Sequence, residues 1–431
     1  MSWWRAFDSA LEEAVTIASA IGRPELVGLA VAGQQHGMIC VDDAGEVLRP
    51  AKLWCDTTST DDADWLVAQL PGGAAAWAAA CGSVPVAAFT ITKLRWLRRN
   101  EPATWARLGG VMLPHDWLTY RLVGRRVTDR GDASGTGYFD PSTDRYRGDL
   151  LALVDGDKDW ANLLPEVLGP RDVAGEREGI VVAAGTGDNM AAALGLGLGV
   201  GDVAVSLGTS GTVFSVSDTP THDGSGAVAG FADATGRYLP LVCTMNATKV
   251  TDAVARLCGL DRAAFDAAAL SVASSGELTL LPYLDGERTP NRPGASGVMS
   301  GLRSDVSVGA FARAAFEGVV CGLLDGLDEL ARHARADGAL HLLGGGARSE
   351  AYRQVLADLS GRVVITSSEP ELVALGACIQ AAAVVEGLAP KLMAERWMLG
   401  ELRHTEPTPQ SAIAAADTRD RYAELRSAQR T

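Results

Sequence analysis

Two segments in the second half of the chain follow the same order of strand, turn and helix. Residues 339–359 read ALHLLGGGARSEAYRQVLADL, an apolar run followed by three glycines and a helix-forming stretch. Residues 362–387 read RVVITSSEPELVALGACIQAAAVVEG and repeat that order. Strands that alternate with helices predict an α/β protein with a parallel or mixed sheet, because parallel neighbours need a crossover connection.

The length of the chain and the spacing of its apolar residues predict two domains that contain further helices and strands. At 431 residues the chain is long for a single core, so we expect two domains, at 1–180 and 181–431. Apolar spacing and turn residues predict helices at 3–20, 59–70, 90–99, 115–123, 246–258, 261–274 and 307–336, a surface helix after 400, strands at 25–33 and within 201–217, a hairpin at 38–54, and loops at 129–165 and 278–302.

The net charge and the cysteine content indicate which partners the protein can bind and in which cellular compartment it works. The net charge is −15, which argues against nucleic acid because phosphate backbones attract basic surfaces. The seven cysteines are scattered singly, without a C-x-x-C pair, as expected of reduced thiols in the cytoplasm. We find neither a long apolar span nor a basic leader, so no membrane contact is expected.

Two glycine-rich turns are candidate nucleotide sites. In SLGTSGTVF (206–214), Gly208, Thr209 and Ser210 offer backbone amides and two hydroxyls to phosphate oxygens. A plain hairpin turn explains the same residues, and local spacing leaves both interpretations open. Gly344–Gly346 end a strand, and Ser349 follows at the expected start of a helix. Three glycines there favour a ligand lying against bare backbone near a helix N-terminus.

Polar side chains follow the strand at 25–33. In AVAGQQHGMI, residues 30–39, Gln35 and His36 come directly after that strand. Amides and imidazole both donate and accept hydrogen bonds, so they suit a polyhydroxylated ligand. A structural role for the histidine is equally compatible with the sequence.

Asp188 and Asn189 lie in a segment rich in glycine and alanine, AAGTGDNMAAALGLGLGVGD (183–202). A carboxylate among such residues is costly unless something binds it or uses it. Asp188 suits the cap of a helix that starts there. It equally suits a general base, which accepts a proton from a substrate hydroxyl during phosphoryl transfer. Spacing alone does not separate these roles.

These motifs together resemble the FGGY carbohydrate kinases, and within them the xylulokinases. The resemblance is carried, in the family's order and over nearly the whole chain, by GQQHG (33–37), LRPAKLWCDTTS (48–59), GTGDNMAAALG (185–195), SLGTSGTVF (206–214), YLDGERTPNRPGASGVMSGL (283–302), AAFEGVVCGL (314–323) and LLGGGARSEAYRQVLADL (342–359). Glycerol kinases are similar in the second half but carry an arginine–glutamate pair where this chain has Gln35 and His36. That difference favours a ketopentose.

The resemblance implies two actin-like (ribonuclease-H-like) ATPase domains with a central cleft, and ATP-dependent phosphorylation of D-xylulose to D-xylulose 5-phosphate. Asp188 would be the general base, with ATP and Mg²⁺ as cofactors and no metal ligand assigned. The other implied site residues are, for the sugar, Gln35, His36, Asn189 and Trp54, and for ATP, Gly208, Thr209, Ser210, Gly344, Gly345, Gly346 and Ser349. The sequence permits a homodimer without specifying one.

One departure from the family pattern concerns the start of the chain. Family members begin with a strand and a D-x-G-[ST] phosphate turn, whereas here Met1 is followed directly by SWWRAF. We therefore expect the first domain to lack its N-terminal strands. The alternatives are a kinase for another sugar or polyol, such as ribulose or xylitol, and a non-catalytic protein that binds sugar or nucleotide.

Overall fold

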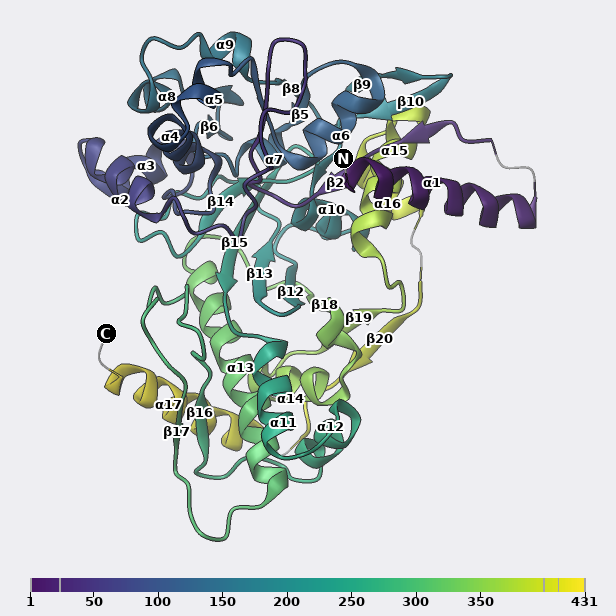
Figure 1. Cartoon of the computed structure of the whole chain (residues 1–431). Coiled ribbons are helices and arrows are strands. Elements are labelled where there is room, and N and C mark those ends of the chain that lie inside the picture. Colours follow the sequence, from purple (N-terminus) through teal and green to yellow (C-terminus); the bar gives the residue numbers. More distant parts are fainter. Residues whose placement is uncertain (1, 23–24, 398–399, 410, 430–431) are drawn as a thin grey trace. The chain divides into compact units, whose positions relative to one another are not determined.

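The structure is a computed structural model that describes residues 2–22, 25–397, 400–409 and 411–429 (Figure 1). The chain forms two compact units, each made of several segments. The first unit comprises Met1–Gly197, Gly230–Tyr238 and Glu371–Met398, and the second comprises Leu198–Ala229, Leu239–Pro370 and Leu399–Thr431. The domain boundary expected at residue 180 stays a prediction.

The first unit mixes short strands with helices. Its elements are α1 (Ser2–Ile21), β1 (Gly28–Leu29), β2 (Ala32–Gly33), β3 (Ile39–Val41), α2 (Thr60–Gln69), α3 (Gly73–Cys81), α4 (Thr90–Asn100), α5 (Pro102–Ala106), β4 (Gly110–Met112), α6 (Pro114–Val123), β5 (Val127–Asp129), α7 (Arg130–Ala133), β6 (Phe139–Asp140), β7 (Arg145–Tyr146), α8 (Gly148–Val154), α9 (Trp160–Leu163), β8 (Glu166–Leu168), β9 (Val173–Arg177), β10 (Ile180–Ala183), β11 (Thr186–Gly187), α10 (Asp188–Gly195), most of β14 (Ala229–Ala232), α15 (Leu372–Glu386) and α16 (Pro390–Arg396).

Two strand pairings in the first unit position its polar motifs. Strand β1 pairs in parallel with β10, and β2 pairs in parallel with β11. In the second pair Gly33 lies opposite Gly187. Because parallel strands end at the same edge of a sheet, the residues that follow β2 and those that follow β11 emerge side by side.

Helix α10 packs closely against α15, which joins the first unit from the far end of the sequence. A Cβ atom on Gly376 would overlap the carbonyl oxygen of Ala191, and one on Gly195 would overlap that of Leu372. The small residues after Asp188 therefore let the two helices meet backbone to backbone. This packing is one physical reason for the alanine- and glycine-rich sequence of α10.

The second unit is built on a mixed sheet. Its elements are β12 (Val203–Leu207), β13 (Gly211–Ser215), β15 (Tyr238–Thr244), α11 (Thr248–Leu257), α12 (Arg262–Leu270), β16 (Thr279–Leu281), β17 (Val298–Ser300), α13 (Val308–Ala331), β18 (Leu340–Leu343), the 3₁₀ turn η1 (Gly345–Arg348), α14 (Glu350–Ser360), β19 (Val364–Ser367), β20 (Leu402–Thr405) and α17 (Ser411–Ala428).

Six strands of this unit pair in the order β15-β13-β12-β18-β19-β20. The three central strands β12, β18 and β19 are parallel, as the repeated strand–turn–helix pattern predicted. Their inner side chains form one core with helices α13 and α14, in which Phe316 and Tyr352 pack edge to face at 4.6 Å between ring centroids. Helix α13 is the long green helix of Figure 1.

Several local predictions need correction. The segment 278–302, expected to be a loop, contains strands β16 and β17, which pair antiparallel with each other. Helix α3 was not predicted. The region 129–165, expected to be loop-rich, contains three short helices, α7, α8 and α9, and the short strand pair β6 and β7. Within the described ranges no single helix meets the length and apolarity needed to cross a membrane; one sharply bent pair, α15 with α16, meets them jointly.

Candidate active site

Asp188 is the first residue of α10, directly after strand β11. Gly187, not Asp188, is the N-cap residue. One carboxylate oxygen, Oδ1, accepts hydrogen bonds from the backbone amide of Asn189 at 2.8 Å and from its side-chain Nδ2 at 2.9 Å. Burial raises the pKa of Asp188 to about 6, although these hydrogen bonds act in the opposite direction. The carboxylate is thus poised to exchange a proton near neutral pH.

Gln35 and Asn189 are brought together by the parallel pairing of β2 and β11. Asn189 Nδ2 donates to Gln35 Oε1 at 3.0 Å. The Gln35 side chain is 5% exposed, and its Nε2 has no hydrogen-bond partner among the described residues. A buried amide donor without a partner is expensive, so Nε2 is a candidate donor to a bound ligand.

His36 occupies a left-handed backbone conformation, with φ at 64°. Its Nδ1 lies 2.6 Å from the carbonyl oxygen of Gly135. Because a carbonyl oxygen only accepts hydrogen bonds, the hydrogen of this contact lies on Nδ1. The imidazole stacks on Phe89 at 4.8 Å and lies tilted against Phe231 at 5.6 Å between centroids. Two aromatic contacts and one hydrogen bond therefore hold the ring orientation.

Trp54 lies in the loop between Leu53 and the start of α2 and is 46% exposed. It is the one exposed residue among the four predicted sugar residues. Its sugar-binding role stays a prediction.

A buried ionisable cluster lies next to the Asp188 turn, and sequence reasoning missed it. His115 Nε2 lies 3.0 Å from Asp116 Oδ1, 3.3 Å from Asp132 Oδ2 and 3.4 Å from Asp129 Oδ1. Burial lowers the pKa of His115, but the three carboxylates outweigh burial and raise it to about 9. Burial also raises the pKa of Asp132 strongly.

This cluster, which we call the His115 cluster, supports the turn that precedes Asp188. Thr186 Oγ1 donates to Asp129 Oδ2 at 2.7 Å. A Cβ on Gly185 would lie 2.8 Å from His115 Nδ1, so the turn rests directly on the imidazole. One histidine and three aspartates within 115–132 were the available sequence signal, but their spacing matches no ligand motif.

In the second unit, Gly208, Thr209 and Ser210 connect the antiparallel strands β12 and β13. The amide of Gly208 donates to the carbonyl of Ser210 at 3.0 Å, so the segment is a hairpin turn. Gly208 and Thr209 are exposed, and Ser210 is half-buried. Hydroxyls and backbone amides at such a turn also suit phosphate oxygens, so its role in nucleotide binding stays a prediction.

Gly344, Gly345 and Gly346 follow β18, the parallel neighbour of β12. Two of them are required by packing: a Cβ on Gly344 would lie 2.7 Å from Leu207 O, and one on Gly346 would lie 2.6 Å from Leu207 Cβ. Gly345 faces open space. Ser349 caps α14, accepting a hydrogen bond from the amide of Tyr352 at 3.1 Å. Both candidate nucleotide turns thus lie at one edge of the sheet, where α/β sheets bind ligands.

The N-terminus of helix α11 also lies at this edge, which the sequence analysis did not foresee. Thr248 Oγ1 donates to Gly208 O at 2.8 Å. The segment before the helix is held by the buried Glu287, which accepts from the Met245 amide at 2.6 Å and from Asn246 Nδ2 at 2.9 Å. Burial raises the pKa of Glu287. The motif YLDGERTP therefore supplies a carboxylate that fixes the turn leading into α11.

Comparison with known proteins decides the family. Residues 1–195 match the N-terminal domain of the FGGY family of carbohydrate kinases, and residues 203–385 match its C-terminal domain. The chain belongs to the FGGY carbohydrate kinases. The family fold of this kinase is the two-domain, actin-like ATPase fold with mixed α/β content that the sequence predicted.

Curated relatives of this FGGY kinase are named xylulose kinase. The protein from Streptomyces coelicolor is 47% identical over 406 residues, covering 92% of this chain and 81% of the relative. The protein from Escherichia coli is 36% identical over 376 residues, covering 84% and 75% respectively. Among solved structures, xylulose kinase from Bifidobacterium adolescentis is 38% identical, with a TM-score of 0.83 over 98% of this chain and 91% of that chain.

Proposed function

We propose that this FGGY kinase transfers the terminal phosphoryl group of ATP to D-xylulose and produces D-xylulose 5-phosphate and ADP. The observation that carries the proposal is the array of Asp188, Asn189 and Gln35 at the ends of two parallel strands. It places a carboxylate with a raised pKa near a buried amide nitrogen, Gln35 Nε2, that has no hydrogen-bond partner among the described residues. The names of the curated relatives support xylulose as the sugar.

In this mechanism Asp188 acts as the general base. Its deprotonated carboxylate accepts the proton of the terminal sugar hydroxyl as that oxygen forms a bond to phosphorus. The bond from phosphorus to the bridging oxygen breaks, and ADP leaves with the electron pair. Asn189 holds Oδ1 of the base through two hydrogen bonds, which fixes the direction of the carboxylate.

The remaining sugar hydroxyls would be bound by Gln35 Nε2, His36 Nε2 and Asn189. Hydrogen-bonding groups that are each held in one direction discriminate between hydroxyl configurations because a mismatched sugar leaves a buried group unpaired. Trp54 would contribute an exposed apolar face beside them.

The second unit would bind ATP. The exposed turn Gly208–Ser210 would hold phosphate oxygens, and the open face at Gly345 would accept the adenosine. Mg²⁺ would supply charge neutralisation on the nucleotide phosphates. Mg²⁺ bound to a nucleotide usually keeps several waters and is held mainly through phosphate oxygens.

A sugar panel tests the proposal. We expect ADP release to depend on sugar, with kcat/KM for D-xylulose at least tenfold above that for D-ribulose and xylitol. Activity on glycerol or gluconate without activity on any ketopentose would overturn the assignment. Binding of sugar and ATP without turnover would instead favour the non-catalytic alternative.

The role of Asp188 is tested separately. Asp188→Asn should lower kcat by roughly 10²- to 10⁴-fold, the usual contribution of a general base, while the affinity for ATP stays unchanged. Asp61→Asn, at an exposed position in the first turn of α2, is the matched control. Turnover within a few-fold of the wild type would refute the base assignment.

We further propose that the protein works in the cytoplasm. No disulfide joins any cysteines among the described residues, which suits a reducing compartment. The proposed partners are the sugar and ATP, and a homodimer stays a proposal for measurement by light scattering.

A further inference from the structure

The backbone of His36 is held in its left-handed conformation by the first turn of helix α4. Lys93 Nζ donates to the carbonyl oxygen of His36 at 2.9 Å, and Thr90 Oγ1 donates to the same oxygen at 3.2 Å. Non-glycine residues rarely adopt such a conformation unless the surroundings enforce it. The carbonyl of His36 is therefore fixed by two donors from one helix end.

The same helix end also holds the imidazole. Phe89 is the N-cap residue of α4, and its ring stacks on the His36 ring at 4.8 Å. The imidazole is also hydrogen-bonded to Gly135 O through Nδ1. Both the main chain and the side chain of His36 thus depend on residues 89–93.

Lys93 is an unusual residue for this task because its side chain is completely buried. Burial lowers its pKa to about 7, the charges of Asp56 and Cys55 act to raise it, and that of Lys52 lowers it further. Nζ also donates to Ala88 O. In a dry site, hydrogen bonds of this kind are stronger than in water, so the cost of burying Lys93 is offset only while its carbonyl partners stay in place.

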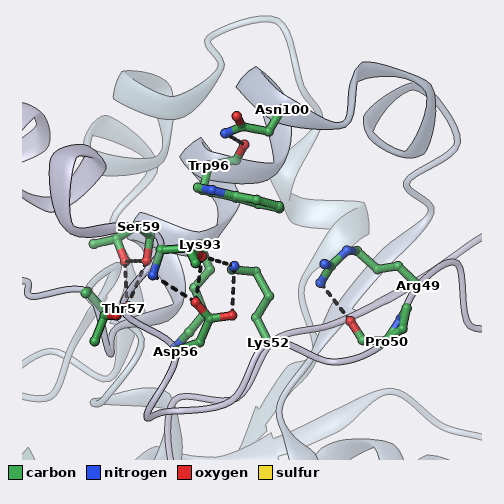
Figure 2. Close-up of polar contacts among 12 residues, drawn as sticks. Arg49, Pro50, Lys52, Asp56, Thr57, Ser59, Lys93, Trp96 and Asn100 are labelled. Carbon is green, nitrogen blue, oxygen red and sulfur yellow. Dashed lines mark hydrogen bonds and ion pairs between the residues drawn. The ribbon is translucent and has the colours of Figure 1, made fainter.

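A second lysine, Lys52, lies close to Lys93 but has different partners. Figure 2 shows Lys52 and Asp56 beside Lys93 and Trp96. Lys52 Nζ pairs with Asp56 Oδ2 at 2.9 Å and lies 3.8 Å from the Trp96 ring centroid. Lys52 therefore pairs with Asp56 and lies over the indole ring, whereas Lys93 donates to the main-chain carbonyls of His36 and Ala88.

We propose that Lys93, assisted by Thr90, is a positioning residue for sugar recognition. By fixing the His36 carbonyl it sets the direction in which the imidazole and the neighbouring Gln35 amide meet the sugar. This inference rests on one part of the proposed function, namely that His36 and Gln35 bind the sugar. It adds a specificity-determining contact that lies outside the hydroxyl-binding residues themselves.

The test compares Lys93→Met with Lys52→Met in the full-length kinase. We expect Lys93→Met to raise KM for the sugar about tenfold or more, while kcat and KM for ATP change less than threefold. Lys52→Met, which removes an equal charge at the neighbouring position, should leave KM for the sugar within twofold of wild type. A purely structural Lys93 would alter kcat and both KM values together, or none of them, and either result would overturn the proposal.

Thr90→Val provides a second route if Lys93→Met does not fold. It removes only the weaker donor to His36 O, and we expect a rise of about threefold in KM for the sugar, with KM for ATP unchanged. An unchanged KM for the sugar would contradict the proposal. The sugar in both assays is the one that the wild type phosphorylates best, so a preference other than D-xylulose would refute the proposed function without affecting this test.

Discussion

Asn189 donates its side-chain amide to Gln35, with Nδ2 3.0 Å from Oε1, and the same nitrogen lies 2.9 Å from Asp188 Oδ1. One amide therefore joins the proposed base to a proposed sugar-binding side chain. The two strands that carry these residues pair directly, so this connection is set by the register of β2 against β11. The proposed sugar recognition and the proposed proton transfer would therefore depend on one hydrogen-bonded unit.

Removal of this amide should impair both steps. Asn189→Ala leaves Gln35 Oε1 and Asp188 Oδ1 without their shared donor, and a buried acceptor without a partner costs about 1–3 kcal/mol. We expect kcat/KM for the sugar to fall by roughly ten- to a hundredfold, with KM for ATP unchanged. Asn162→Ala, on the exposed surface of α9, is the control and should retain full activity. Equal activity of the two variants would contradict the coupling.

The raised pKa of Asp188 predicts the acid limb of the pH–rate profile. The base works only when deprotonated, and burial holds its pKa at about 6. At saturating ATP, kcat/KM for the sugar should rise about tenfold per pH unit below that value and level off above it. A profile that stays flat down to pH 4.5 would show that a carboxylate with an ordinary pKa, or no carboxylate, limits the reaction.

The three glycines after β18 should respond differently to alanine. Gly346→Ala places a methyl group 2.6 Å from Leu207 Cβ, and we expect the free energy of unfolding to fall by about 1–3 kcal/mol. Gly345→Ala meets nothing within 4 Å, so stability should change by less than about 0.5 kcal/mol, while KM for ATP rises. Urea denaturation and nucleotide kinetics measure the two effects. A stable Gly346→Ala, or an unchanged KM in Gly345→Ala, would contradict the assignment.

The His115 cluster predicts a pH-dependent contribution to stability. The pKa of His115 is raised to about 9 in the folded protein, against an ordinary value of about 6.5 when unfolded. Its stabilisation is therefore complete below about pH 6.5 and is lost as pH rises through about 9. The difference in unfolding free energy between wild type and His115→Gln should shrink over that window, measured by urea denaturation. The exposed His404→Gln is the control, and a difference that stays constant with pH would refute the prediction.

Periodicity and motifs predicted the parts of the fold that depend on local sequence. The helices at 90–99 and 115–123 correspond to α4 and α6, and the glycine turn after 343 lies between a strand and a helix as expected. Gln35 and Asn189, from motifs far apart in the sequence, are in contact. The roles of the site residues themselves stay predictions, because a hydrogen-bonded arrangement identifies neighbours and not substrates.

Features that depend on long-range packing could not be predicted. His115 meets three carboxylates only because α6, β5 and α7 converge beneath one turn, and nothing in the local sequence specifies that convergence. Strands β16 and β17 are separated by a long loop rich in glycine and proline, so their pairing left no hairpin signal. Lys93 lies in an ordinary amphipathic helix, and its contact with His36 is visible only in three dimensions.

The contact between α10 and α15 has a consequence for synthesis of the protein on the ribosome. The helix that begins with Asp188 packs, backbone against backbone, on a segment that starts at Leu372. That partner emerges only after nearly all of the second unit has been translated. A nascent or prematurely terminated chain ending before Leu372 therefore contains every sugar-side residue in its sequence but lacks the surface on which its base-bearing helix rests. Catalytic competence should appear late in translation, and only in chains that reach this helix.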